Sequence, residues 1–505
     1  MKSAFRKAAL SLALPLALSS CVKTSGELGK DLIDKSLLYD TYTIEFPIEE
    51  VLLRRADDLS GFSDTRITIG AIRDDTFGLT TRSSAFTLVP ALDTLDIGTD
   101  PRFVSFKIHF AADTVSCADP SEQYILQNFF VYSLTDTLSS KKAGTNRDIP
   151  HGTEIVSRGV PVYDGTDSLS FEFNEAFGNR YIAALQKHGP ALVDRSGSTP
   201  VSKYSAFIRD VPGIYIESDI PEGNGGRINL FDLSILTVNS SSYYQRNGNS
   251  ATLTVSSVYD GVRKDTSFLF IPGEPAFYDE QTYIDNNQKF YQYAFNRTSH
   301  EAPERTASDL IYVEGGGGLK PVFPAAPIQK KVLAAIAAHG GDPEKTVINK
   351  ASLILPFECS EDEIELVDQF PSMLSPTIRI TSDDGAVTFG GLTDASASSE
   401  NQGTLDRSNL AYAPDVTYHL QEILGRDDLE IDDNADIWLL TVHSETTVNA
   451  TGNAEQEAYY QQMMYAMYYN NLYGGGYGYG GYGYSGYGYG SYGYGGYGSN
   501  YYNYL

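Results

Sequence analysis

Most of the chain alternates apolar and polar residues with a period of two, the pattern of strands that bury one face. The alternating runs are rich in Thr, Tyr, Phe and Val, and they are separated by Gly, Asn or Asp. These features are typical of antiparallel β-sandwiches. The clearest runs are residues 66–69, 103–110, 168–173, 214–216, 251–255 and 437–442. The pattern predicts a mainly β fold of two tandem antiparallel β-sandwich, jelly-roll-like units with a few short helices.

Three segments have apolar residues at the spacing of an amphipathic helix. They are residues 175–188, 329–339 and 418–424. Gly340 and Gly341 follow the second segment directly, and glycine is common just beyond a helix C-terminus. The sequence therefore predicts short helices inserted between the strands.

Two stretches of the chain look like one motif used twice. Each has an alternating strand, a loop with a cysteine and a second strand, at 103–110, Cys117 and 128–132 and again at 348–357, Cys359 and 377–380. This repetition predicts a first β-sandwich domain at 41–275 and a second at 276–455. Because the two cysteines fall at equivalent places, separate buried thiols are favoured over a disulfide between them, which is the alternative.

Residues 1–20 have the composition of a secretory signal peptide. Basic residues come first, followed by an apolar stretch at 8–18 that is too short to span a hydrocarbon core about 30 Å thick. The order Leu18-Ser19-Ser20-Cys21 resembles the lipobox of bacterial lipoproteins. This resemblance implies cleavage before Cys21, a diacylglycerol with palmitate-like chains on its sulfur and an acylated amino group. The alternative is an ordinary signal peptide with a chance cysteine. Residues 21–40 are polar and are interpreted as a lipidated tether.

Residues 456–505 form a low-complexity tail that differs from the rest of the chain. It holds 18 of the 36 tyrosines, mostly in Gly-Tyr units, and has no charged residue after position 458. So much glycine makes an ordered backbone costly, and few aliphatic residues are present to build a core, so we expect a flexible extension. The alternative is an aromatic contact surface for a glycan, the cell wall or another Gly-Tyr segment, with Tyr477 and Tyr479 as candidate binding residues.

The charge of the chain excludes one class of partner. There are 37 Lys and Arg against 65 Asp and Glu, a net charge of −28. Because binding to nucleic acid needs clustered cations, we expect no nucleic-acid partner. Three cysteines are also too few for a disulfide scaffold or a four-cysteine zinc site.

The densest run of carboxylates lies at 427–436, and its candidate binding residues are Asp432, Asp433 and Asp436. Calcium takes six to eight oxygen ligands, but this run lacks the turn glycine and the final glutamate of a calcium loop. A solvated loop before the strand with Trp438 is therefore favoured. Trp438 itself, the single tryptophan, stands on an apolar run, which favours a core position over a sugar-stacking platform.

No catalytic constellation emerges from the sequence. Four glycines lie between Glu314 and Lys320, but Leu319 precedes the lysine and Pro321 follows it, which is not the order of a phosphate-binding loop. A tight turn or bulge is favoured there. The seven histidines include no pair spaced for zinc on a helix, and no Gly-x-Ser-x-Gly motif occurs. We therefore predict no catalytic residue, no metal and no cofactor.

Several phrases in order resemble a known family. They are residues 67–88 with Ile67-Thr68-Ile69-Gly70 and Arg73-Asp74-Asp75-Thr76-Phe77-Gly78, residues 207–216, residues 312–320 and residues 347–353. Together they resemble the uncharacterised Bacteroidota outer-membrane lipoprotein family catalogued as domain of unknown function 4270, over about residues 21–445. The resemblance implies a two-part β-rich body on an outer-membrane lipid anchor, and it supplies no catalytic residues. The Gly-Tyr tail departs from the family pattern.

Within these phrases, the glycines fit turns or bulges. Gly70, Gly78 and the run 315–318 are expected where the backbone needs a positive φ or a close approach. Asp74 and Asp75 are interpreted as turn and cap residues.

Taken together, the sequence predicts a lipid-anchored outer-membrane lipoprotein without enzymatic activity. Its expected role is binding or structural, in an envelope assembly with an outer-membrane protein partner. The alternative is a surface glycan-binding module or adhesin. The pattern leaves open whether the protein faces the cell surface or the periplasm.

Overall fold

The computed structural model describes residues 41–445 and 500–502, apart from gaps at 64–65, 92–93, 118, 139–143, 195, 197–200, 234–235, 239–242, 246–247, 274–293, 309, 358–369, 383–386, 393, 395–402 and 426–432. Residues 48–505 form one unit, separate from the residues that precede them. The account below concerns this unit.

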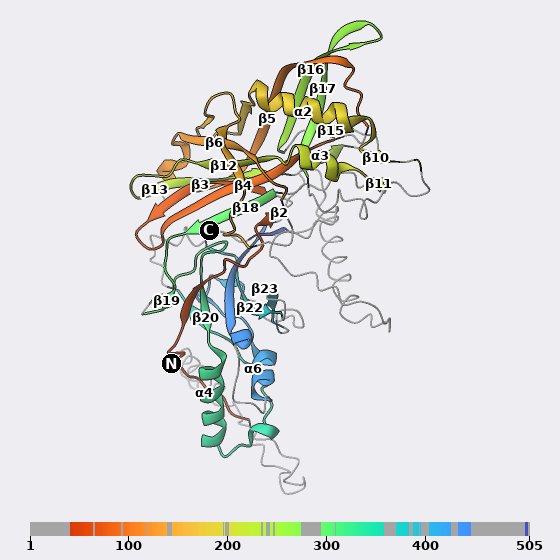
Figure 1. Cartoon of the computed structure of the whole chain (residues 1–505). Coiled ribbons are helices and arrows are strands. Elements are labelled where there is room, and N and C mark those ends of the chain that lie inside the picture. Colours follow the sequence, from red (N-terminus) through yellow and green to blue (C-terminus); the bar gives the residue numbers. More distant parts are fainter. Residues whose placement is uncertain are drawn as a thin grey trace, which may run out of the picture. The chain divides into compact units, whose positions relative to one another are not determined.

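The larger sheet is antiparallel and has thirteen strands (Figure 1). Its main path runs β17 (Val262–Gly273), β16 (Ser250–Tyr259), β5 (Thr99–Cys117), β13 (Gly225–Asp232), β3 (Arg66–Asp74), β4 (Gly78–Pro90), β12 (Ile214–Ser218), β6 (Gln127–Leu134) and β7 (His151–Ile155). Four further strands pair beside this path: β2 (Phe62–Ser63), β8 (Val162–Tyr163), β9 (Ser168–Glu172) and β18 (Ala294–His300).

The second sheet has seven strands. Its order is β19 (Arg305–Thr306), β1 (Leu52–Arg55), β20 (Leu319–Phe323), β26 (Ile437–Glu445), β22 (Met373–Thr381) and β23 (Val387–Gly391), and β27 (Asn500–Tyr502) pairs with β26. Three small sheets complete the described strands: β10 (Val193–Asp194) with β11 (Val201–Ser202), β14 (Leu236–Val238) with β15 (Tyr243–Gln245), and β21 (Leu355–Pro356) with β25 (Ala411–Tyr412) and β24 (Leu405–Asp406). The predicted mainly β, antiparallel fold is confirmed.

Strand pairing does not follow the order of the chain. β1 pairs with β20, more than 260 residues later, so the first strand lies in the sheet built from the end of the chain. Conversely, β18 pairs with β4 in the thirteen-stranded sheet. Pairing therefore crosses the expected boundary at 275/276 in both directions, and the domain division itself stays a prediction.

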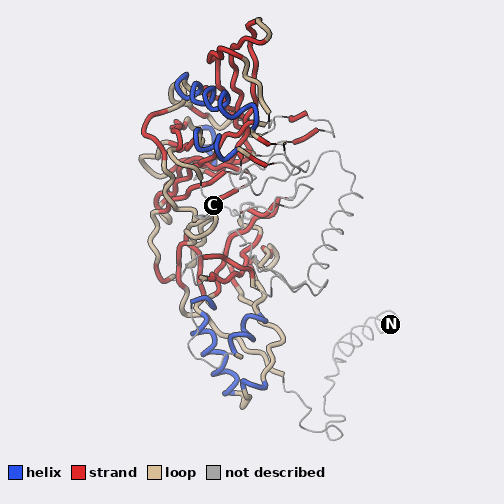
Figure 2. Tube along the Cα trace, turned by 45° about the vertical axis from the view of Figure 1, so that its right-hand side comes forward, coloured by secondary structure: helices blue, strands red, loops and turns tan. Residues whose placement is uncertain are grey.

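Within the described residues, four short α-helices accompany the sheets: α2 (Glu175–His188), α3 (Tyr204–Asp210), α4 (Ala325–Ala338) and α6 (Thr417–Leu424). Short 3-10 turns occur at Pro120–Tyr124 (η3), Gly189–Ala191, Pro343–Lys345 and Asp433–Ala435. α4 and α6 lie side by side (Figure 2), joined where Gln329 Nε2 donates to the carbonyl of Ile423 at 2.9 Å.

Local signals account for two of the helix ends. α2 begins where predicted, because the side chain of Asn174 accepts a hydrogen bond from the N–H of Phe177 at 2.9 Å. α4 ends as predicted, since Gly340 has a φ of +70° and the N–H of Gly341 donates to the carbonyl of Ile336 at 2.9 Å. α3 was not expected from the sequence, because its seven residues span barely two turns.

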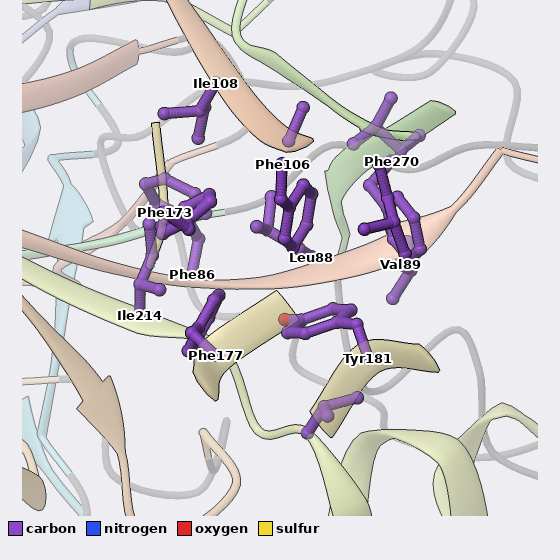
Figure 3. Packing of buried hydrophobic residues seen from close by; sticks show 14 of the residues in the cluster. Phe86, Leu88, Val89, Phe106, Ile108, Phe173, Phe177, Tyr181, Ile214 and Phe270 are labelled. Atoms are coloured by element: carbon purple, nitrogen blue, oxygen red, sulfur yellow. The ribbon is translucent and has the colours of Figure 1, made fainter. Parts of the chain in front are cut away.

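The main core lies under α2, where aromatic rings from sheet and helix meet (Figure 3). Phe106 of β5 is fully buried, and its ring lies 4.8 Å from that of Phe173 and 5.0 Å from that of Tyr181 on α2, centroid to centroid. Phe270 of β17 closes the group at 5.5 Å from Phe106. Such close aromatic packing stabilises beyond the area that it buries.

The expected strand at 348–357 is wrong. Only Leu355–Pro356 is strand there, and Ile354 is 63% exposed. Over most of this segment no neighbouring described strand offers a full ladder, since isolated bonds such as Leu353 N–H to the carbonyl of Pro414 take its place. The alternating letters alone did not supply the partner that a strand needs.

Cys117 also differs from its expected place. It is the last residue of β5 rather than part of a loop, and it is a half-buried free cysteine rather than a fully buried one. Cys359 lies outside the described residues. With the strand at 348–357 absent, the proposed repeat of one motif loses its second copy.

Truncation of the core aromatic tests this packing. We expect Phe106→Ala to lower the free energy of unfolding by about 3–5 kcal/mol, because it leaves a cavity among four aromatic rings. Val104→Ala, on the same strand but 45% exposed, should change it by less than about 0.5 kcal/mol. Urea unfolding followed by circular dichroism measures both. Equal losses in the two variants would contradict the assigned core.

Candidate functional site

Several ionisable side chains are buried together where β4, β18 and β20 meet. Arg82 on β4 lies directly opposite Thr298 on β18, and Thr80 lies opposite His300. Since directly opposed residues of antiparallel strands point to one side of a sheet, these four side chains share a face. They supply a guanidinium, an imidazole and two hydroxyls to one location.

The other two members come from the four-glycine segment. Glu314 precedes the glycines and Lys320 follows them as the second residue of β20. The loop is closed by the N–H of Glu314, which donates to the carbonyl of Leu319 at 2.9 Å. In return, the N–H of Leu319 donates to Glu314 Oε2 at 3.0 Å. These bonds place the acid and the amine beside each other.

The carboxylate of Glu314 is the centre of the group, which we call the Glu314 cluster (Thr80, Arg82, Thr298, His300, Glu314 and Lys320). Its Oε1 accepts from Thr80 Oγ1 at 2.8 Å and lies 2.5 Å from His300 Nδ1. The ammonium of Lys320 donates to the main-chain carbonyl of Glu314, and the guanidinium of Arg82 donates to the hydroxyl of Thr298. The ionisable members are between 0% and 8% exposed.

The glycines are required by this packing. A Cβ at Gly316 would overlap the guanidinium of Arg82, and one at Gly318 would overlap the carboxylate of Glu314. Gly316 also has a φ of +58°, which favours glycine. The predicted turn with close backbone approach is therefore confirmed here. Gly70 and Gly78 fit too, with φ of +154° and +70° and, at Gly70, the backbone of Arg227 in the way of a Cβ.

Burial governs the acid–base behaviour of the cluster. It lowers the pKa of Lys320 to about 7 and that of Arg82 to about 10, against the opposing attraction of Glu314. Burial also lowers the pKa of His300. For Glu314, burial acts to raise the pKa, but the hydrogen bonds that its carboxylate accepts from His300, the Leu319 N–H and Thr80 hold the pKa below its usual value.

The proton of His300 is assigned from its surroundings. Nδ1 faces the carboxylate of Glu314, whereas the buried Nε2 has no hydrogen-bond partner. Because burial disfavours the imidazolium, we assign the neutral ring with its proton on Nδ1. His300 is thus a donor to Glu314, and it leaves one buried acceptor unsatisfied.

The cluster is a junction between the two large sheets. It fastens β4 and β18 of the thirteen-stranded sheet to β20 of the seven-stranded sheet. At its edge, Arg55 of β1 donates to the carbonyl of His300 at 3.1 Å and pairs with Asp57 at 3.3 Å. Its groups contact one another, so their hydrogen bonds hold strands from both sheets together.

Of the candidate binding and lipidation residues singled out by sequence, the structure describes Asp433 and Asp436. Asp436 accepts a hydrogen bond from the N–H of Ala325 at 2.9 Å and so caps α4, which begins four residues earlier than predicted. Asp433 lies in a 3-10 turn. Asp432, Tyr477, Tyr479 and Cys21 lie outside the described residues. Across the part of the chain that the structure describes, no group of three metal-ligating side chains occurs.

Two structural interpretations are confirmed. Trp438 is 7% exposed and its ring lies edge-on to Phe389 at 5.4 Å, so it belongs to the core. Asp74 Oδ1 accepts from the N–H groups of Thr76 and Phe77 at 2.7 and 2.8 Å, which makes it a turn residue.

The Glu314 cluster was missed from sequence. Its one local signal is that a charged residue lies on either side of the four-glycine run. That run by itself predicts only a turn. Thr80 and Glu314 are 234 positions apart, and nothing in the local pattern around β4 points to the loop.

Comparison with models of known families, with curated proteins and with solved structures found no match. The family resemblance therefore stays a prediction. Among the residues with a described position, no helix is both long enough and apolar enough to cross a membrane.

A pair of glycine substitutions tests the packing on Arg82. Gly316→Ala and Gly340→Ala both place alanine at a positive φ, of +58° and +70°, which costs roughly 1–2 kcal/mol. Only Gly316 has a neighbour within reach of the added methyl, because nothing lies within 4 Å at Gly340. We expect the loss of unfolding free energy to be clearly larger for Gly316→Ala, measured by urea unfolding. Equal losses would argue against close packing at the loop.

The pH dependence of stability tests the buried amine. Lys320 has a pKa of about 7 when folded against an ordinary value of 10.5. Between these values the unfolded chain binds more protons than the folded protein, so this residue makes stability rise with pH from about 7 to 10.5. Below about pH 7 both states carry the charge, and the cost of burying it is constant.

Lys320→Met removes that contribution. We expect the stability of the variant relative to wild type to be highest near neutral pH and to fall as the pH is raised toward 10. Urea unfolding at several pH values measures the difference, which cancels contributions from other groups. If the stabilities of the variant and the wild type change in parallel with pH, the folded protein does not lower the pKa of the Lys320 amine.

Proposed function

We propose that this protein is a lipid-anchored outer-membrane lipoprotein with a non-catalytic binding or structural role in an envelope protein assembly. The observation that carries the proposal is Leu18-Ser19-Ser20-Cys21 directly after a basic and then apolar segment. That order supplies both an export signal and an acylation site. The resemblance to the outer-membrane lipoprotein family supports the same location.

The energetics support a lipid anchor as the attachment. Each buried CH₂ contributes about 0.8 kcal/mol, so one chain binds marginally whereas two or three chains on Cys21 hold a protein firmly. The body does not help, because a net charge of −28 is repelled by anionic head groups. Loss of three basic residues with the signal peptide makes the mature chain more acidic still.

The non-catalytic part of the proposal is supported by the chemistry of the Glu314 cluster. Strongly shifted pKa values often mark an active site, but ion-pair networks that hold a fold shift them too. Lys320 has no exposed surface, and its amine is engaged by the carbonyl of Glu314. An amine held in this way supports a role in the stability of the fold rather than a role in reaction with a substrate.

Separate substitutions of Cys21 and Cys117 test the anchor. Cells fed an alkyne-tagged palmitate should label wild type and Cys117→Ser but not Cys21→Ser. The unlabelled variant should leave the membrane fraction. Cys117 is a free cysteine inside β5, so it controls for loss of a thiol as such.

Mass spectrometry of the mature N-terminus completes this test. We expect a chain that begins at an acylated Cys21. A chain that starts elsewhere, or an unmodified Cys21 in membrane-bound protein, would contradict the proposal. Purification of the anchored protein in mild detergent should recover an outer-membrane partner in fixed ratio.

A further inference from the structure

Exposed apolar side chains gather where β6 begins. Five large ones are 40–70% exposed there: Tyr124, Leu126, Val160, Val162 and Ile220. They belong to three neighbouring segments. The N–H of Phe129 on β6 donates to the carbonyl of Pro161, beside Val162, at 2.8 Å. Asn128 on β6 donates to Asp219, beside Ile220. We call these five residues the β6 patch. Single exposed apolar residues are ordinary, but a concentration of this kind marks a contact surface.

The patch continues along the outward side of β6. Leu126 lies just before the strand, and the side chains at alternate positions, Asn128, Phe130 and Tyr132, share its side of the sheet. Phe130 and Tyr132 are partly exposed. Val162 of β8 lies directly opposite Asn128, so β8 widens this surface.

The patch is held rigidly from below by a buried arginine. Arg227 of β13 is fully buried and donates to the carbonyl of Gln123 in η3 and, through Nη2, to that of Tyr163 at 3.3 Å. Gln127 Nε2 donates to the carbonyl of Arg227 at 2.7 Å. Fixing η3, β6 and β8 in this way lowers the ordering cost of a partner that binds above them.

Carboxylates border the patch on its β12 side. Glu217 lies opposite Phe130, and Asp219 Oδ2 accepts from the N–H and the side-chain amide of Asn128 at 3.2 and 2.8 Å. Glu222 follows on an exposed turn. Glu217 accepts from the hydroxyl of Tyr215 at 3.3 Å. Among the described residues, Glu217 and Asp219 have neutral hydrogen-bond partners and no ion pair with a cation.

The charge decides which partner fits. An isologous contact with a second copy would bring these carboxylates near their own copies, and anionic head groups would be repelled in the same way. A cationic partner is attracted both by this border and by the net charge of −28. Apolar side chains on the same partner would bury Leu126 and Val162.

We propose that the β6 patch is the docking surface for a protein segment that presents apolar side chains flanked by Lys or Arg. This inference rests on the proposed binding role but not on the lipid anchor. The apolar contacts supply affinity, and Glu217 and Asp219 supply selectivity for a basic segment.

Peptide binding tests this surface directly. The probes are three fluorescein-labelled peptides of equal length that alternate valine with lysine, valine with glutamate, and serine with lysine. They are titrated by fluorescence anisotropy against the full chain carrying Cys21→Ser. We expect the valine–lysine peptide to bind at least about tenfold more tightly than either of the others, which is about 1.4 kcal/mol.

Variants of the patch locate the contact. Leu126→Ser with Val162→Ser should weaken binding of the valine–lysine peptide by about tenfold or more. Glu217→Gln with Asp219→Asn should weaken it at low salt and flatten its salt dependence, because screening removes the same attraction. Val262→Ser, on β17 and 64% exposed, is the matched control and should bind as wild type does.

Several outcomes would overturn the proposal. Equal binding of all three peptides would contradict the proposed docking surface. Undiminished binding by the Leu126 and Val162 double variant would contradict it too. If the full chain self-associates or floats with phosphatidylcholine vesicles, and the same double variant abolishes that behaviour, the patch binds a second copy or a membrane and the proposal is contradicted. Unfolding midpoints confirm that each variant is folded. If a fixed-ratio envelope partner still co-purifies with the double variant, the surface is wrong while the proposed function stands.

Discussion

The carboxylate of Glu314 offsets two buried cations at the place where the two large sheets join. Lys320 and Arg82 are both sealed from solvent, and burying either alone is costly because a charge loses its hydration. Glu314 attracts both, while Thr80, His300 and the Leu319 N–H satisfy its own oxygens. Two of the four glycines in the loop leave room for these groups, because a Cβ at Gly316 would overlap Arg82 and one at Gly318 would overlap Glu314.

At this junction, each of the two large sheets contains strands from both parts of the chain. β1 adds to the seven-stranded sheet and β18 to the thirteen-stranded sheet, so neither sheet is complete from one continuous segment. β18 carries Thr298 and His300 into the cluster, and Arg55 of β1 reaches the carbonyl of His300. Loss of the cluster would therefore loosen strands in both sheets together.

A different buried cation serves the surface that we propose for docking. Arg227 is fully buried, but its partners are main-chain carbonyls and Gln127. Hydrogen bonds to backbone oxygens fix the positions of η3 and β8, and hence of the apolar side chains above them. The carboxylates beside these side chains give an acidic protein a defined place at which to meet a basic partner.

Local patterns in the sequence determined most of the expected strands, the class of fold and two helix ends. The alternation at 103–110 and the cap at Asn174 are local, so neighbouring residues suffice to predict them. The start of α4 was not predictable, because its cap Asp436 lies 111 positions away. The strand predicted at 348–357 was wrong for the same reason. A strand needs a pairing partner, and the sequence of the segment itself does not show whether one lies beside it. The Glu314 cluster was decided by tertiary structure alone, because burial and charge pairing between positions 80 and 314 exist only after the sheets have formed.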